Sequence, residues 1–442
     1  MRLERDQEFW QIELAGGVYT IRTGRIGTHG QSERHACGSA ELAQRGHDDA
    51  IAHAREQGFV EPMGEMSTTG LELRNPALEA ALRDDHDDRE AFLVYADWLQ
   101  AAGNPFGELV ALAVRTDGAP KDPDIVARID WLRASLRLPV PEGVTYVFRW
   151  GLFESLRIQN FTMRPTMLEL LPPLFGHVMC AALDELRIGG PPSKRTLTLA
   201  EQVIDEAGKH AWAAGLRRLH VGRDDPSDPK TAFRYPDFDA GLIGARISQT
   251  FPRLERLRVQ AGVKSGGAAS SLEDLDLPHL RELVVLAGWF GEQRYHQLVT
   301  MNVPALERLE LWLPASPAAR PADPTQLHGL FANRRFETVR DLALRNSHHA
   351  DAFAAAIPEW PIAATLETLD LSWGTLSDDG ARALLVNPRK LRALQHLVVD
   401  RSYVSQEMVR ALAARYPRVS ANDQRSPTTA SQRVIYRPPG YY

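Results

Sequence analysis

A short pattern of leucine and polar positions recurs through the second part of the chain. Alternation of apolar and polar residues is typical of a strand with one buried face, so each recurrence predicts a short strand. Nine segments fit the template L-x-x-L-x-L, some with another apolar residue in place of a leucine: FESLRI from residue 153, LDELRI from 183, LRRLHV from 216, LERLRV from 254, LRELVV from 280, LERLEL from 306, VRDLAL from 339, LETLDL from 366 and LQHLVV from 394.

The spacing of these segments indicates a repeated structural unit. Their starts are separated by 30, 33, 38, 26, 26, 33, 27 and 28 residues. Intervening stretches such as DDGARALLV (378–386) have helical periodicity, and a unit of this size buries its apolar face only by stacking on its neighbours. The region resembles the leucine-rich-repeat family, although the asparagine expected after the strand occurs only as Asn160 and Asn346. The resemblance implies an α/β solenoid with parallel strands on the concave face and helices on the convex face.

The residues on either side of the middle leucine of each segment are expected to face away from the core. They are basic in the early segments and acidic or apolar in the later ones, which favours an acidic protein partner at the early segments. A solvated face that binds nothing fits the same pattern. The candidate partner-binding residues are Arg157, Arg187, Arg218, His220, Arg256, Arg258, Arg308, Glu310, Asp341 and Asp370.

Four aromatic residues follow predicted strands: Trp289, Trp312, Trp373 and Tyr403. If they are exposed together, they form a ledge suited to anchoring a partner. The alternative is that they pack beneath the loops.

The first sixty residues carry a different pattern. FWQIEL (9–14) alternates as a half-buried strand does, VYTIRTGRIG (18–27) is a second strand, and a helix begins after Ser39. This order, with GRIGTHGQ (24–31) as its most specific part, resembles a WGR domain, known from poly(ADP-ribose) polymerases, where it contacts DNA ends. Thr23 stands where the family has tryptophan, which removes a surface for stacking on a base. We therefore favour a protein-docking role over nucleic-acid contact, whose candidate residues are Arg22, Arg25, His29 and Arg34.

The middle of the chain predicts three helices around an acidic loop. The string REAFLVYADWLQAAGNPFGELVAL (89–112) resembles a bacterial repeat-companion domain that occurs beside leucine-rich repeats and has no established activity. The loop DDHDD (84–88) gathers carboxylates, which hard cations prefer, but its spacing is not that of a calcium-binding loop. We expect these aspartates to cap the following helix, and we expect no metal site.

Composition and missing motifs bear on function. Of the 442 residues 44% are hydrophobic and 24% are charged, the net charge is -6, and no apolar stretch is long enough for a membrane helix. The charged start and the two cysteines, Cys37 and Cys180, favour reduced thiols and a cytoplasmic location. The sequence has no P-loop, nucleophile elbow, zinc-protease motif or paired CxxC. We therefore expect no cofactor and no enzymatic activity.

The predicted organisation has five parts: a WGR-like domain (1–62), a linker (63–74), a helical repeat-companion segment (75–150), a leucine-rich-repeat solenoid (151–424) and a tail (425–442) that either caps the solenoid or is disordered. The predicted function is a protein-binding adaptor or scaffold. Two alternatives remain open: a nucleic-acid-linked regulator acting through the WGR-like domain, and a substrate-recruiting subunit of a separate enzyme.

Overall fold

The chain folds into two compact units, Met1–Gly70 and Leu71–Tyr442, which we describe separately. The computed structural model describes residues 2–5, 8–25, 30–59, 74–118, 122–135, 140, 143–158, 167–189, 199–222, 243–261, 272–287, 292–313, 324–332, 336–386 and 389–426. His29, Trp289, the predicted linker up to 73 and the predicted tail from 427 onward lie outside these ranges, and only the backbone of Arg25 is described.

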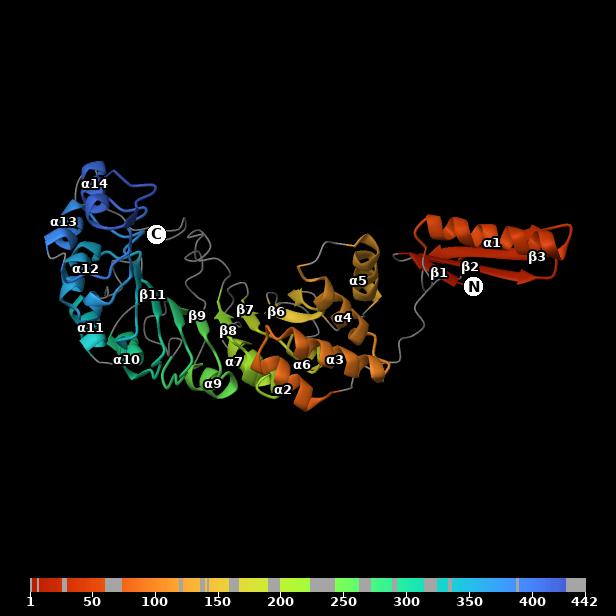
Figure 1. Cartoon of the computed structure of the whole chain (residues 1–442), viewed down its shortest axis with the longest axis horizontal. Helices are drawn as coiled ribbons and strands as arrows, with labels where there is room; N and C mark the ends of the chain where they lie inside the picture. Colours follow the sequence, from red (N-terminus) through yellow and green to blue (C-terminus); the bar gives the residue numbers. More distant parts are fainter. Residues whose placement is uncertain are drawn as a thin grey trace. The chain divides into compact units, whose positions relative to one another are not determined.

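The first unit is an antiparallel sheet with one helix packed on it (Figure 1). Its strands follow chain order as β1 (Arg2–Arg5), β2 (Glu8–Ala15), β3 (Val18–Arg25) and β4 (Gln31–Ala36), and the helix is α1 (Ala40–Glu56). The Ser39 hydroxyl accepts a hydrogen bond from the Leu42 amide at 3.2 Å, so the predicted cap of this helix is confirmed. Leu3, Trp10, Ile12, Ala54 and Phe59 form the core between sheet and helix. Strand β1 had no clear signal in the sequence.

The second unit begins with four helices. They are α2 (Pro76–Asp84), α3 (Arg89–Ala101), α4 (Phe106–Thr116) and α5 (Pro123–Ser135). Asn75 caps α2 through its side chain, and Asp88 caps α3 by accepting from the amides of Glu90 and Ala91 at 2.9 and 3.2 Å. At Gly107 an added Cβ would lie 2.5 Å from the carbonyl oxygen of Ala96, so α4 packs closely on α3 only with glycine there.

An eleven-stranded sheet forms most of the second unit, and its strands lie side by side in chain order. Strand β5 pairs with β6 antiparallel, and every other pair is parallel. The strands are β5 (Val144–Arg149), β6 (Leu152–Ile158), β7 (Glu185–Ile188), β8 (Arg218–Val221), β9 (Arg256–Ala261), β10 (Glu282–Ala287), β11 (Arg308–Trp312), β12 (Asp341–Arg345), β13 (Thr368–Asp370), β14 (His396–Val398) and β15 (Arg418–Ser420).

The nine predicted strands are all present as β6 to β14, and their middle leucines stand in register. From Leu156 in β6 to Leu397 in β14, each of these leucines pairs with the next and is no more than 2% exposed. The same apolar position therefore builds one continuous core layer across the sheet. The predicted α/β class is confirmed.

Helices between successive strands run along one side of the large sheet (Figure 1). No helix in the described ranges is long and apolar enough to cross a membrane. The α-helices are α6 (Met167–Phe175), α7 (Leu199–Ala207), α9 (Gly244–Thr250), α10 (Glu292–Thr300), α11 (Pro324–Ala332), α12 (Ala350–Ala356), α13 (Asp378–Val386) and α14 (Gln406–Arg415), and the short 3₁₀ helices are η2 (Val178–Cys180), η3 (Ala211–Gly215), η5 (Ile357–Glu359) and η6 (Pro361–Ala364).

Candidate functional site

Two rows of side chains cross the large sheet on the face opposite the leucine layer. Strand pairing places equivalent residues side by side, about 4.8 Å apart from strand to strand. The first row is Ser155, Glu185, Arg218, Arg256, Glu282, Arg308, Asp341, Thr368 and His396. The second row is Arg157, Arg187, His220, Arg258, Val284, Glu310, Ala343, Asp370 and Val398. The two rows contain all ten predicted partner-binding residues.

The second row is basic where it crosses β6 to β9. Arg157, Arg187, His220 and Arg258 occupy four consecutive register positions. Like charges directly opposite one another are destabilising, and burial together with the charge of Arg187 lowers the pKa of Arg157. Guanidinium groups nevertheless stay charged at neutral pH, so this stretch concentrates positive charge. We call these four residues the basic stretch.

Arginines of the first row are held by carboxylates at the starts of neighbouring strands. Arg218 lies 2.5 Å from Asp184 and 3.4 Å from Glu154. Arg256 is 64% exposed at its side chain and lies 3.8 Å from Glu282. Arg187 of the second row donates a hydrogen bond to Glu185 of the first row at 2.9 Å. The eight positions of the two rows on β6 to β9 hold five arginines and one carboxylate, Glu185. Carboxylates outside these eight positions pair with the two arginines of the first row, so the basic character of this part of the face rests on the arginines of the second row.

From β10 to β13 the same face is occupied by an internal network. Glu310, 4% exposed, accepts hydrogen bonds from Arg308 at 2.8 Å and from the Trp312 indole at 2.6 Å, and lies 3.1 Å from Arg345. Arg345 also donates to Asp370, 3% exposed, at 2.7 Å. Burial opposes ionisation of Glu310, but Arg345 and Arg308 outweigh it and hold its pKa below the ordinary value. We call these residues the paired network.

Burial makes Glu310 and Asp370 poor candidates for direct contact with a partner, because their carboxylates are already bonded within the chain. Arg345, which joins them, was missed in the sequence. It is the last residue of β12 and lies two residues after Ala343, so the strand period of two places it on the same face. That period was the signal that could have identified it.

The aromatic residues do not form an exposed ledge. Trp312 is fully buried, Tyr403 is 8% exposed, and Trp373 is half-buried beside Trp312 with ring centroids 6.3 Å apart. Val284 and Leu286 complete this cluster. Arg345 lies over the Trp312 ring and Arg401 over the Trp373 ring, so cations cover the aromatic faces. Of the two arrangements left open for these residues, packing is the one that the structure shows for Trp312, Trp373 and Tyr403.

The acidic loop between α2 and α3 contacts the beginning of the large sheet. Asp84 lies 2.5 Å from Arg253, and its carbonyl accepts from Arg217 at 3.2 Å. His86, 4% exposed, lies 3.0 Å from Asp184, and Asp87 pairs with Arg149. Asp84 and Asp87 thus form ion pairs with arginines that are distant in sequence, and these pairs join the helices to the sheet.

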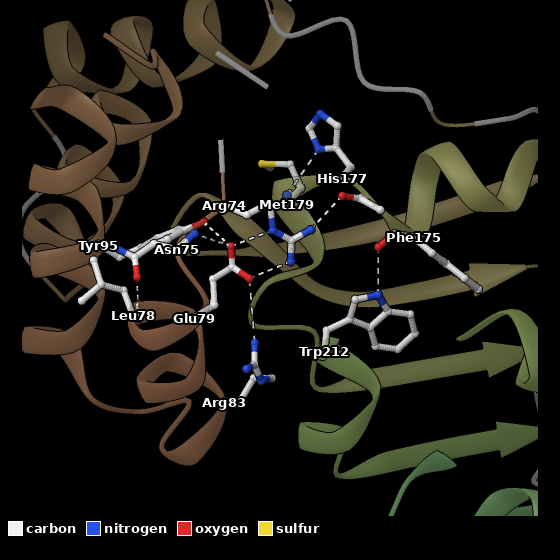
Figure 2. A network of polar contacts seen from close by, with 11 residues as sticks. Arg74, Asn75, Leu78, Glu79, Arg83, Tyr95, Phe175, His177, Met179 and Trp212 are labelled. Atoms are coloured by element: carbon white, nitrogen blue, oxygen red, sulfur yellow. Dashed lines mark hydrogen bonds and ion pairs between the residues drawn. The ribbon is translucent and has the colours of Figure 1, made fainter. Parts of the chain in front are cut away.

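A second set of contacts joins the same two regions (Figure 2). The buried carboxylate of Glu79 accepts two hydrogen bonds from Arg74, each 2.7 Å long, while Arg74 also donates to the carbonyl of Gly176 at 2.8 Å. Close by, burial and the charge of Arg74 lower the pKa of His177 to about 4, so this histidine is neutral near pH 7. Its Nδ1 accepts from the Met179 amide at 3.3 Å.

In the first unit, the candidate nucleic-acid residues are only partly brought together. Arg22 donates to Gln11 at 3.1 Å and lies over the Phe9 ring, so its guanidinium already has partners in the sheet. Arg34 is exposed on β4, two strand positions from Ser32, which is opposite Arg22. Thr23 is exposed and pairs with Trp10.

Comparison with known proteins identifies one domain family in this chain. Residues 3–65 match the model of the WGR domain family, so the first unit contains a WGR domain. No curated protein matches the sequence. A crystal structure of a protein from Bacteroides fragilis, determined as a structural genomics target, is similar in fold with a TM-score of 0.50 and 18% identity, over 98% of this chain and 97% of that one.

Proposed function

We propose that this chain is a non-catalytic protein-binding adaptor or scaffold. In this proposal the second unit is a leucine-rich-repeat solenoid preceded by a repeat-companion segment, and its concave strand face binds an acidic segment of another protein. The WGR domain serves as a docking module. The observation that carries the proposal is the basic stretch, Arg157, Arg187, His220 and Arg258, at four consecutive register positions.

Electrostatic complementarity supports an acidic partner. Aligned cations repel one another within the chain, and a row of partner carboxylates would remove that repulsion. The strand face is also long and continuous, as expected of a surface that contacts an extended segment of a protein. The carboxylates of the paired network are bonded within the chain, so we assign binding to the β6 to β9 part of the face, where the second row carries three arginines.

Affinity capture from native lysate, followed by mass spectrometry with and without nuclease, tests this function. Arg187→Gln combined with Arg258→Gln removes two cations of the basic stretch. Arg281→Gln is the matched control, because Arg281 is 63% exposed at its side chain and lies outside both rows. A protein retained by the wild type and the control, lost from the double variant and unaffected by nuclease is the expected result. Equal retention by all three contradicts the proposal.

A nucleic-acid-linked regulator is the second candidate, and the WGR match supports it. Exposed Arg34 is its best described residue. Binding of duplex DNA ends that weakens steeply with salt and is reduced by Arg34→Gln would favour this function, because phosphate contacts release counterions. Absence of binding at low salt would exclude it.

A further inference from the structure

A cavity of about 580 Å³ lies among α4, α5 and the turn from β5 to β6, apart from both rows on the sheet face. Its size is within the range of small-molecule sites in proteins, about 300–1,000 Å³. Among the described residues, its lining includes Ala113, Val126, Ile129, Arg133 and Phe148. Nothing in the proposed protein-binding function uses this cavity.

One wall of the cavity is apolar and comes from a single face of α5. Val126 and Ile129 are one helical turn apart and lie opposite Phe148 of β5 and Ala113 of α4. Val126 is 37% exposed, which leaves an aliphatic side chain at the cavity without cover. These residues offer an apolar ligand a surface that water solvates poorly.

The turn that closes one end is fixed in an unusual conformation. Trp150 and Gly151 form a two-residue hairpin turn with φ of 47° and 82°, and a bulky residue rarely adopts such a positive φ. The Trp150 indole donates to Asp117 at 2.9 Å, and its ring packs edge-on against Phe92. Asp117 therefore accepts a hydrogen bond from the turn, and these contacts fix the position of Trp150 at this end of the cavity.

Arg133 supplies a cation with spare hydrogen-bonding capacity. It lies on the same face of α5, its guanidinium is 5.2 Å from the Phe148 ring centroid, and the carboxylate of Asp130, which also lines the cavity, is 3.9 Å away. Its Nε is buried and has no hydrogen-bond partner among the residues that the structure describes. Arg149, the other lining arginine, is already paired with Asp87. The buried Nε of Arg133 is not accessible from the cavity, but the Arg133 side chain is 37% exposed as a whole, so the remaining guanidinium donors are the ones available to an anion.

We propose that this cavity binds a small amphiphilic monoanion, with its apolar part against Val126, Ile129 and Phe148 and its carboxylate or equivalent anionic group on Arg133. Arg133 and the apolar wall define this ligand class, and the carboxylates of Asp117 and Asp130, which also line the cavity, restrict it to a single negative charge.

Two dyes of similar shape test the proposal with the full-length chain. 1-Anilinonaphthalene-8-sulfonate carries one negative charge, whereas N-phenyl-1-naphthylamine is neutral, and both fluoresce more strongly in apolar surroundings. We expect saturable binding of the anionic dye, at one site per chain, displaced by octanoate. Arg133→Gln should weaken it at least about tenfold, equivalent to about 1.4 kcal/mol, because bonds to charged groups contribute at least that much. The neutral dye should bind Arg133→Gln as it binds the wild type.

Two further variants keep this test decisive. Val126→Trp fills the cavity from its exposed side and should abolish binding of both dyes with an unchanged melting temperature. Arg128→Gln is the matched control, because Arg128 lies on the same helix but pairs with Glu108 and does not line the cavity; it should bind both dyes normally. Binding of the anionic dye that survives Arg133→Gln or Val126→Trp overturns the proposal. Displacement of the anionic dye by an oligoglutamate peptide, without displacement by octanoate, overturns it as well. Neither result depends on the basic stretch, so this proposal fails or stands separately from the proposed function.

Discussion

The two parts of the strand face of the second unit are built on the same strand register but manage charge in opposite ways. From β10 to β13, Glu310 and Asp370 are buried and joined through Arg345. From β6 to β9, the second row presents Arg157, Arg187, His220 and Arg258 with no carboxylate between them. Burying a carboxylate demands an internal partner, whereas the half-buried arginines of the second row stay charged beside one another, and His220 between them is only 7% exposed. The first arrangement therefore serves stability, and in our proposal the second binds an acidic partner.

The largest expected effect is loss of the cation that joins the paired network. Arg345→Ala should lower the free energy of unfolding by about 3–5 kcal/mol, because two buried carboxylates lose a shared partner. Arg281→Ala, which removes an exposed cation 3.2 Å from Glu307, should cost about 1 kcal/mol or less. Urea unfolding of both variants measures the difference. Equal losses would mean that the paired network is not a stabilising element.

A smaller effect, and one that depends on pH, is expected for Glu310. Its pKa in the folded chain is below the ordinary value of 4.5, so its stabilisation is fully present above that value and is lost as the pH falls through the lower folded pKa. Glu310→Gln should therefore cost about 1–3 kcal/mol at neutral pH, and its stability should converge with that of the wild type in acid. Unfolding midpoints measured across the acidic range test this, and a difference that is independent of pH would refute it.

The smallest effect on stability is expected in the basic stretch. Arg187→Gln with Arg258→Gln removes like-charge repulsion along with the contact between Arg187 and Glu185, so the free energy of unfolding should change by about 1 kcal/mol or less. Thermal unfolding at low and high salt is the measurement. A loss as large as that expected for Arg345→Ala would show that the basic stretch is also a structural network, and the comparison between the two parts would fail.

The sequence predicts the strands of this protein, and the residues on their outer face, better than it predicts which side chains those residues contact. Leucine periodicity is local, so it located β6 to β14 and assigned all ten candidate residues to one face. The contacts that decide the role of those residues are not local. Glu154 lies within β6 and Asp184 just before β7, yet both pair with Arg218 of β8. The pairing of Asp84 with Arg253 spans 169 residues. No short-range pattern records such a pair.

Strand β5 and helix α5 were not predicted from the sequence, for different reasons. Strand β5 does alternate, with Val144, Tyr146 and Phe148 at every second position, but its WG turn lacks the usual hairpin residues. Helix α5 has charged and apolar residues without a clear face, and its apolar side became evident only from the cavity that it lines. Packing of Trp312 was one of the two arrangements that the sequence left open, and its neighbours could not be named because Leu286 and Trp373 come from other strands and loops.

Titration of the full-length chain with a labelled oligoglutamate peptide is the most direct test of the central claim that the basic stretch binds acidic segments. The account predicts saturable binding that weakens with salt, falls at least about tenfold in Arg187→Gln with Arg258→Gln, and is unchanged in Arg281→Gln. Binding of equal strength in all three proteins, or no binding at low salt, would contradict it.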